Sequence, residues 1–255
     1  MSTAPETNPK LLRADIQFFA LSSIYPYIRQ YCQEYLTDAE PDFTVTVQQS
    51  DLDFEREKTK REFAAEGLPE PNFQGSYLET LAVYRKIAKE MLSHDTILFH
   101  GSAIAVDGEG FLFTATSGTG KSTHTRLWRE HFGDRAIMVN DDKPLLRIKD
   151  GKVWVCGTPW DGKHRLSTNT MVPLKGIAVL TRGEHNSIRR MPAAMALPTV
   201  LQQCHRPADT QSVSKMLELI DRMLTQVPVY LLKCNMDPEA ARVSYEAMSG
   251  RKMEE

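Results

Sequence analysis

Hydrophobic and polar residues recur along this chain in patterns that predict helices and strands in its N-terminal part. Residues 43–47 alternate as a half-buried strand, and residues 52–66 predict a charged helix, because acidic and basic residues are interleaved at helical spacing. Apolar residues recur on one face over residues 77–92, which predicts an amphipathic helix. Residues 25–36 also fit a helix, whereas residues 1–10 are polar with two prolines and are expected to lack order.

The remainder of the chain alternates short apolar runs with helical patterns. Strands are predicted at residues 110–114, 136–139, 144–148, 153–156, 177–180, 187–191 and 229–232, and helices at residues 122–131, 213–224 and 238–248. Asp150-Gly151 suits a type I′ turn and predicts a hairpin. We therefore expect an α/β (α+β mixed) fold, in which a small α+β lobe over residues 1–95 precedes a mixed β-sheet flanked by helices over residues 96–255.

Composition and charge narrow the class of protein. The 255 residues are 41% hydrophobic and 25% charged, which is typical of a globular protein. A net charge of −2 gives no overall attraction to nucleic acid or to an anionic membrane, so neither is expected as a partner. The chain has no apolar run of transmembrane length and no apolar signal core, so we expect a cytoplasmic location. The 4 cysteines lack a Cys-x-x-Cys pair, which argues against a zinc site or a disulfide framework.

A Gly-rich segment between a predicted strand and a predicted helix carries the clearest chemistry. Gly118 and Gly120 can adopt backbone conformations closed to other residues, so that successive N–H groups point at phosphate oxygens. Lys121 would reach the β- and γ-phosphates of ATP, and the Ser122 hydroxyl would ligate Mg²⁺. The alternative is a loop that only turns the chain. The residues expected to bind the nucleotide are Thr116, Ser117, Gly118, Thr119, Gly120, Lys121, Ser122 and Thr123.

Two carboxylates follow the next predicted strand, which ends in Asn140-Asp141-Asp142. Open α/β sheets bind ligands at the carboxyl ends of their strands. One aspartate could hold Mg²⁺ while the other accepts a proton from an attacking hydroxyl, and the alternative is a turn that closes the strand. In the loop over residues 157–165, Lys163 or Arg165 could neutralise a transferring phosphoryl group, although an ordinary exposed loop fits this segment equally well.

The stretch from His100 to Asp142 resembles the catalytic core of HPr kinase/phosphorylase and, more distantly, that of phosphoenolpyruvate carboxykinase. The matching residues are His100-Gly101, Asp107-Gly108-Glu109-Gly110, the loop from Thr116 to Ser122 and Val139-Asn140-Asp141-Asp142. This resemblance implies a phosphate loop on a mixed sheet, Mg²⁺-ATP as substrate, transfer to a hydroxyl, a role for His100 in orienting phosphate or substrate, and assembly into a homo-oligomer. Thr116 stands where the family has a catalytic aspartate, so Asp141 or Asp142 would have to be the base.

These patterns together predict a kinase that transfers the γ-phosphate of Mg²⁺-ATP to a hydroxyl acceptor. We favour a small metabolite over a protein serine as the acceptor, because no long docking domain is visible. The predicted catalytic residues are Asp141, Asp142, Lys121, His100 and Lys163, and the predicted metal ligands are Ser122, Asp141 and Asp142. Two alternatives stay open: a carboxykinase-like lyase, and a nucleotide-sensing module without transfer, which Thr116 favours.

Overall fold

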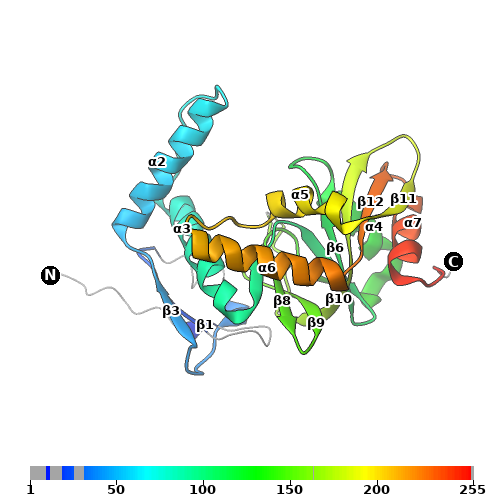
Figure 1. The fold of residues 1–255 in the computed structure, drawn as a ribbon, viewed down its shortest axis with the longest axis horizontal. Coiled ribbons are helices and arrows are strands. Elements are labelled where there is room, and N and C mark those ends of the chain that lie inside the picture. Colours follow the sequence, from blue (N-terminus) through cyan, green and yellow to red (C-terminus); the bar gives the residue numbers. More distant parts are fainter. Residues whose placement is uncertain (1–9, 12–18, 26–31, 163, 254–255) are drawn as a thin grey trace. The chain divides into compact units, whose positions relative to one another are not determined.

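The computed structural model describes residues 10–11, 19–25, 32–162 and 164–253, and it divides into two compact units, Met1–Glu90 and Met91–Glu255 (Figure 1). Residues 1–9, for which the sequence predicts a lack of order, lie outside the described residues. The same prediction was wrong at residue 10, because β1 (Lys10–Leu11) pairs antiparallel with β2 (Phe19–Ser22).

Among its described residues, the first unit combines a three-stranded sheet with two α-helices. β2 lies between β1 and β3 (Phe43–Thr46), and it is parallel to β3. The helices α2 (Gln49–Ala65) and α3 (Gly75–Glu90) confirm both predicted helices. The helix predicted over residues 25–36 falls partly outside the described residues. Its described part forms only the 3₁₀ turn η1 (Gln33–Tyr35), because Leu36 is already extended at φ −71° and ψ 143°.

The second unit contains a nine-stranded mixed sheet. Its strands are β4 (Thr96–Leu98), β5 (Ser102–Val106), β6 (Glu109–Thr114), β7 (Ala136–Asn140), β8 (Leu145–Lys149), β9 (Lys152–Cys156), β10 (Met171–Arg182), β11 (Ser187–Met191) and β12 (Val229–Cys234). They follow the order β4-β8-β9-β10-β6-β5-β7, while β12 pairs with β10 and β11 pairs with β12. β10 pairs antiparallel with β9 at its start, up to Pro173, and then parallel with β6 from Leu174 onward, with a register shift between Leu174 and Gly176. The sheet is therefore curled, and β10 joins its two parts.

The hairpin predicted around Asp150-Gly151 is confirmed. β8 and β9 pair antiparallel up to Lys149 and Lys152, which leaves a two-residue loop. Asp150 has φ 51° and Gly151 has φ 70°. A type I′ turn requires a positive φ at both central residues, so this short-range sequence signal was sufficient to predict the hairpin.

Helices cover both faces of the sheet (Figure 1). Side chains along each strand alternate between these faces, so neighbouring residues of one strand pack against different helices. Along β10, Ile177 and Val179 pack in the core beneath α5 (Ala193–Gln203) and α6 (Thr210–Gln226). Ala178 and Leu180 pack in the core beneath α4 (Lys121–Phe132) and α7 (Glu239–Ser249). Trp128 lies at the centre of this second core. The result is a mixed α/β unit with helices on both sides of the sheet.

Four strands end at the same edge of this sheet. β6, β10 and β12 are mutually parallel, and β7 is parallel to them because β5 runs antiparallel to both β6 and β7. In the order β12-β10-β6-β5-β7, the segment after β6 has the ends of β10 and β12 on one flank and the end of β7 on the other. Such an edge is where open α/β sheets bind ligands.

Neither disulfides nor membrane-spanning helices occur in the part of the chain that the structure describes. All 4 cysteines are free, and Cys32, Cys156 and Cys204 are buried. Within the described residues, no helix has both the length and the apolar surface that crossing a membrane requires.

Candidate functional site

The Gly-rich loop, residues 115–120, connects β6 to α4 and confirms the strand and helix predicted on either side of it. Gly118 has φ 77° and Gly120 has φ 123°, values that residues with a Cβ rarely adopt. Thr119 closes the turn, because its backbone N–H and its Oγ1 both donate to Thr116 O, at 3.2 and 2.8 Å.

Several backbone donors of this loop are without acceptors. Among the described residues, none accepts a hydrogen bond from the N–H groups of Ser117, Gly118 or Gly120. The first N–H groups of an α-helix also have no partner within the helix, and α4 begins directly after Gly120. A row of such donors at the positive end of a helix dipole is suited to bind phosphate oxygens.

Arg182, at the end of β10, contacts the Gly-rich loop on the flank where β10 lies. Its Nη2 donates to Gly118 O at 2.7 Å, so that this carbonyl is turned toward Arg182. Arg182 was not selected from the sequence, in which it only starts a turn. The available signal was a basic residue at the carboxyl end of a buried strand.

Lys121 lies between the Gly-rich loop and the end of β7. Its Nζ donates to Ala115 O at 3.3 Å. Burial lowers the pKa of Lys121 from its ordinary value and nearby Lys143 lowers it further, whereas Asp142 and Asp141 oppose this shift. The charges of both aspartates therefore act on the Lys121 ammonium group.

The turn after β7 is made by Asn140. Its Oδ1 accepts from the N–H groups of Asp142 and Lys143, at 2.8 and 2.6 Å, and its Nδ2 donates to Thr158 Oγ1 at 2.9 Å. An Asx turn closes this strand, as the alternative interpretation of the sequence predicted. Because the Asn140 amide makes it, the carboxylates of Asp141 and Asp142, the acidic pair, stay available for other contacts.

The two members of the acidic pair have different surroundings. Asp141 is buried and accepts a hydrogen bond from Ser102 Oγ at 2.6 Å. Its other oxygen faces Gly162, where an added Cβ would lie 3.3 Å from Asp141 Oδ2. Asp142 is half-buried, and its Oδ1 lies 3.4 Å from His100 Nε2 and 3.6 Å from Lys143 Nζ.

His100 is held next to Asp142 in its neutral form. Burial, together with the charges of Lys143 and Lys121, lowers the pKa of His100 to about 4. His100 Nδ1 lies 3.0 Å from Gln203 Oε1, so the hydrogen-bond network assigns the ring proton to Nδ1. The lone pair of Nε2 then faces Asp142 Oδ1 at 3.4 Å, and both atoms are acceptors, so a substrate hydroxyl, which has one proton, can donate to one of them.

Ser122 and Lys163 are the predicted metal-binding and catalytic residues that remain to be located. Ser122 is exposed near the start of α4, and its hydroxyl donates to no described residue. Lys163 lies outside the described residues, so its predicted role stays a prediction. Within the described residues no group of three His, Cys, Asp or Glu side chains could hold a metal ion. A hydroxyl and carboxylates nevertheless fit Mg²⁺, which binds through few protein oxygens and completes its shell with phosphates and water.

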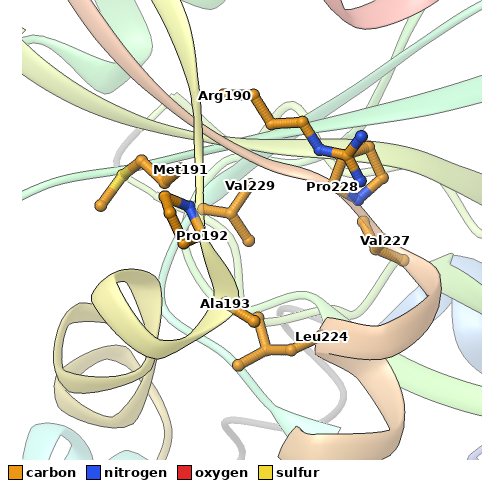
Figure 2. A pocket seen from close by; sticks show the side chains of 8 residues that line it. All are labelled: Arg190, Met191, Pro192, Ala193, Leu224, Val227, Pro228 and Val229. Atoms are coloured by element: carbon orange, nitrogen blue, oxygen red, sulfur yellow. The ribbon is translucent and has the colours of Figure 1, made fainter.

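Two pockets lie at opposite edges of the sheet. One, of about 510 Å³, includes Gly118, Gly120 and Arg182 in its lining and is called the flank pocket below. The other, of about 380 Å³, is lined by Arg190 and seven apolar residues (Figure 2). This second pocket lies at the start of β12 and holds no carboxylate or nucleophile, so it is not part of the candidate site.

His124, which lines the flank pocket, is expected to make stability depend on pH. Burial lowers the pKa of His124 to about 4 from an ordinary value of 6.5. Between pH 6.5 and pH 4 the unfolded chain therefore binds a proton at this residue and the folded protein does not. The free energy of unfolding falls as the pH is lowered through this range. We expect His124→Gln to remove about 2 to 3 kcal/mol of this dependence. Denaturant unfolding of both proteins at pH 7 and pH 4.5 measures the difference, and equal losses in the two proteins would contradict the prediction.

Comparison with known proteins yields a family model and distant likenesses to solved structures. The family model for the SynChlorMet cassette protein ScmC matches residues 73–239. No curated protein matches the chain. Among solved structures, the Hpr(Ser) kinase/phosphatase from Coxiella burnetii is similar at 14% identity and a TM-score of 0.35, over 60% of this chain and 93% of that chain. A TM-score this low supports no conclusion about activity.

Proposed function

The chain belongs to the ScmC family of SynChlorMet cassette proteins, and we propose that it is a phosphotransferase that moves the γ-phosphate of Mg²⁺-ATP to a hydroxyl acceptor. The observation that carries this proposal is the arrangement at one edge of the sheet. The unpartnered N–H groups of the Gly-rich loop and the Lys121 ammonium lie at the same edge as the acidic pair. One group of residues can bind phosphates, and the other can hold a metal ion and accept a proton.

Asp141 is the better suited of the two aspartates to hold a metal ion. It is buried, and the Ser102 hydroxyl fixes one of its oxygens. With the exposed Ser122 hydroxyl, it would hold Mg²⁺, whose charge offsets that of the phosphates when it is bound. Lys121 adds a second positive charge on the transferring phosphoryl group.

Asp142 is the better suited to act as the base. It is partly open to solvent, and the bare Nε2 of His100 lies beside it. An acceptor hydroxyl placed next to Asp142 would donate its proton to that carboxylate while its oxygen forms a bond to the γ-phosphorus. The bond between that phosphorus and ADP breaks in the same step, and ADP leaves with its terminal oxygen. We place a small metabolite, rather than a protein serine, as this acceptor.

Phosphorus NMR tests the proposal directly. The protein is incubated with Mg²⁺-ATP and a pool of hydroxyl-bearing metabolites, beside the Lys121→Ala variant. New phosphoester signals that are lost in the variant would support the proposal and identify the acceptor. ATP that binds but stays unchanged with every metabolite and protein acceptor would favour the nucleotide-sensing alternative, and consumption of oxaloacetate with nucleotide would favour the lyase.

A further inference from the structure

The flank pocket lies beside the Gly-rich loop, and we infer that it receives the nucleoside part of the nucleotide. This inference rests on the proposed function, since it requires the phosphates to lie on the loop. The lining of the pocket comes from the loop, α4 and the ends of β10 and β12: Gly118, Thr119, Gly120, Thr123, His124, Leu180, Arg182, Gly183, Cys234, Asn235 and Met236.

The position of the pocket fixes the direction of a bound nucleotide. β10 and β12 lie on one flank of β6, and β7 with the acidic pair lies on the other. Neither Lys121 nor the acidic pair lines the pocket. A phosphate chain laid along the loop therefore has its reacting γ-phosphate near the acidic pair and its nucleoside end on the opposite flank, at the pocket.

The lining suits a flat heterocycle rather than another anion. Leu180, Cys234 and Met236 provide an apolar surface, and Met236 is 75% exposed. A thioether packs favourably against aromatic rings, so a base seated here would cover an otherwise exposed apolar side chain. The volume of about 510 Å³ lies within the range for small-molecule sites and is far larger than a single phosphate needs.

His124 adds a buried hydrogen-bond acceptor that has no donor among the described residues. The Ser244 hydroxyl donates to Ala240 O at 2.9 Å, so the Nε2–H of His124, 2.9 Å from Ser244 Oγ, is the donor in that pair. The lone pair is then on His124 Nδ1, which is buried and has no hydrogen-bond partner among the described residues. Three other polar side chains of the pocket are already engaged: Arg182 binds the loop, Thr119 Oγ1 donates to Thr116 O and Asn235 Nδ2 donates to Asp237 Oδ2. The amino and hydroxyl groups of a nucleoside supply the missing kind of donor.

Cys234 offers a test that requires no substitution. It is the partly exposed cysteine of the chain, whereas the other three are buried. Burial raises the pKa of its thiol, so the reaction with a small methanethiosulfonate reagent is followed at pH 8.5 by mass spectrometry. We expect saturating Mg²⁺-ATP to slow the modification of Cys234 about tenfold or more and Mg²⁺-tripolyphosphate, which lacks a nucleoside, to leave it nearly unchanged. The Cys234→Ser protein is the control that assigns the signal.

A pocket-filling variant provides the second measurement. Cys234→Trp is expected to weaken binding of ATP about tenfold or more and to leave binding of tripolyphosphate unchanged, which also shows that the variant is folded. If tripolyphosphate binds and ATP fails to protect Cys234, or if both protect it equally, the nucleoside is not in the flank pocket and the inference is wrong while the phosphate site stands. If neither compound binds to the unmodified protein, the proposed function fails and the inference fails with it.

Discussion

Replacing Lys121 with alanine is expected to abolish phosphate transfer and to leave the fold intact. The Lys121 ammonium is held between the Gly-rich loop and the acidic pair, where it would offset charge that develops on the transferring phosphoryl group. Removing one such electrostatic contact typically costs about 10² to 10³ in rate. The measurement is the rate of phosphoester formation, with the acceptor identified by NMR.

A matched control separates this effect from a general loss of positive charge. Lys149 is exposed at the end of β8, in the hairpin, so Lys149→Ala removes a lysine outside the site. We expect Lys149→Ala to retain full activity, and both variants to keep the circular dichroism spectrum and the unfolding midpoint of the natural protein. Full activity in the Lys121→Ala protein would overturn the assignment of the phosphate site.

Replacing each aspartate of the acidic pair by asparagine is expected to change a different kinetic property of the protein. Asp142→Asn removes the proton acceptor, so we expect kcat to fall by about 10² to 10⁴ while the affinity for Mg²⁺-ATP changes little. Asp141→Asn keeps an oxygen for the Ser102 hydrogen bond but removes a charge from the metal site. We expect it to raise the Mg²⁺ concentration needed for half-maximal activity.

Titration of Mg²⁺ at saturating ATP, together with binding measured by calorimetry, distinguishes the two variants. The roles assigned above require that Asp142→Asn mainly lowers kcat and that Asp141→Asn mainly raises the Mg²⁺ concentration needed for half-maximal activity. The reverse pattern would exchange the two roles. Unchanged kinetics in both variants would show that the acidic pair takes no part in transfer.

Local signals were enough to predict much of the sheet and the centre of the candidate site. The Asp150-Gly151 hairpin, the connection from β6 to α4 and the acidic pair after β7 each depend on residues close together in the sequence. Turn chemistry and hydrophobic periodicity report such short-range structure directly.

Features that depend on tertiary structure could not be predicted in this way. The helix α5 was missed because it contains Pro198, which normally ends a helix, and because its sequence carries few polar residues. Ser102 and Gln203 touch residues 39 and 103 positions away, and Arg182 reaches Gly118 across 64 positions. Their roles follow from the strand order, which no single stretch of the sequence specifies.

The parallel pairing of β6, β10 and β12 has a consequence for synthesis of the chain on the ribosome. The segment after β6 is made early, but β10 begins only at Met171 and β12 only at Val229. Pairings this distant in sequence are slow to form, and they cannot form before the later strand has emerged. A nascent chain that ends before Val229 therefore carries the Gly-rich loop without β12 on its flank, and we expect the capacity to hold a whole nucleotide to appear only after β12 has been made.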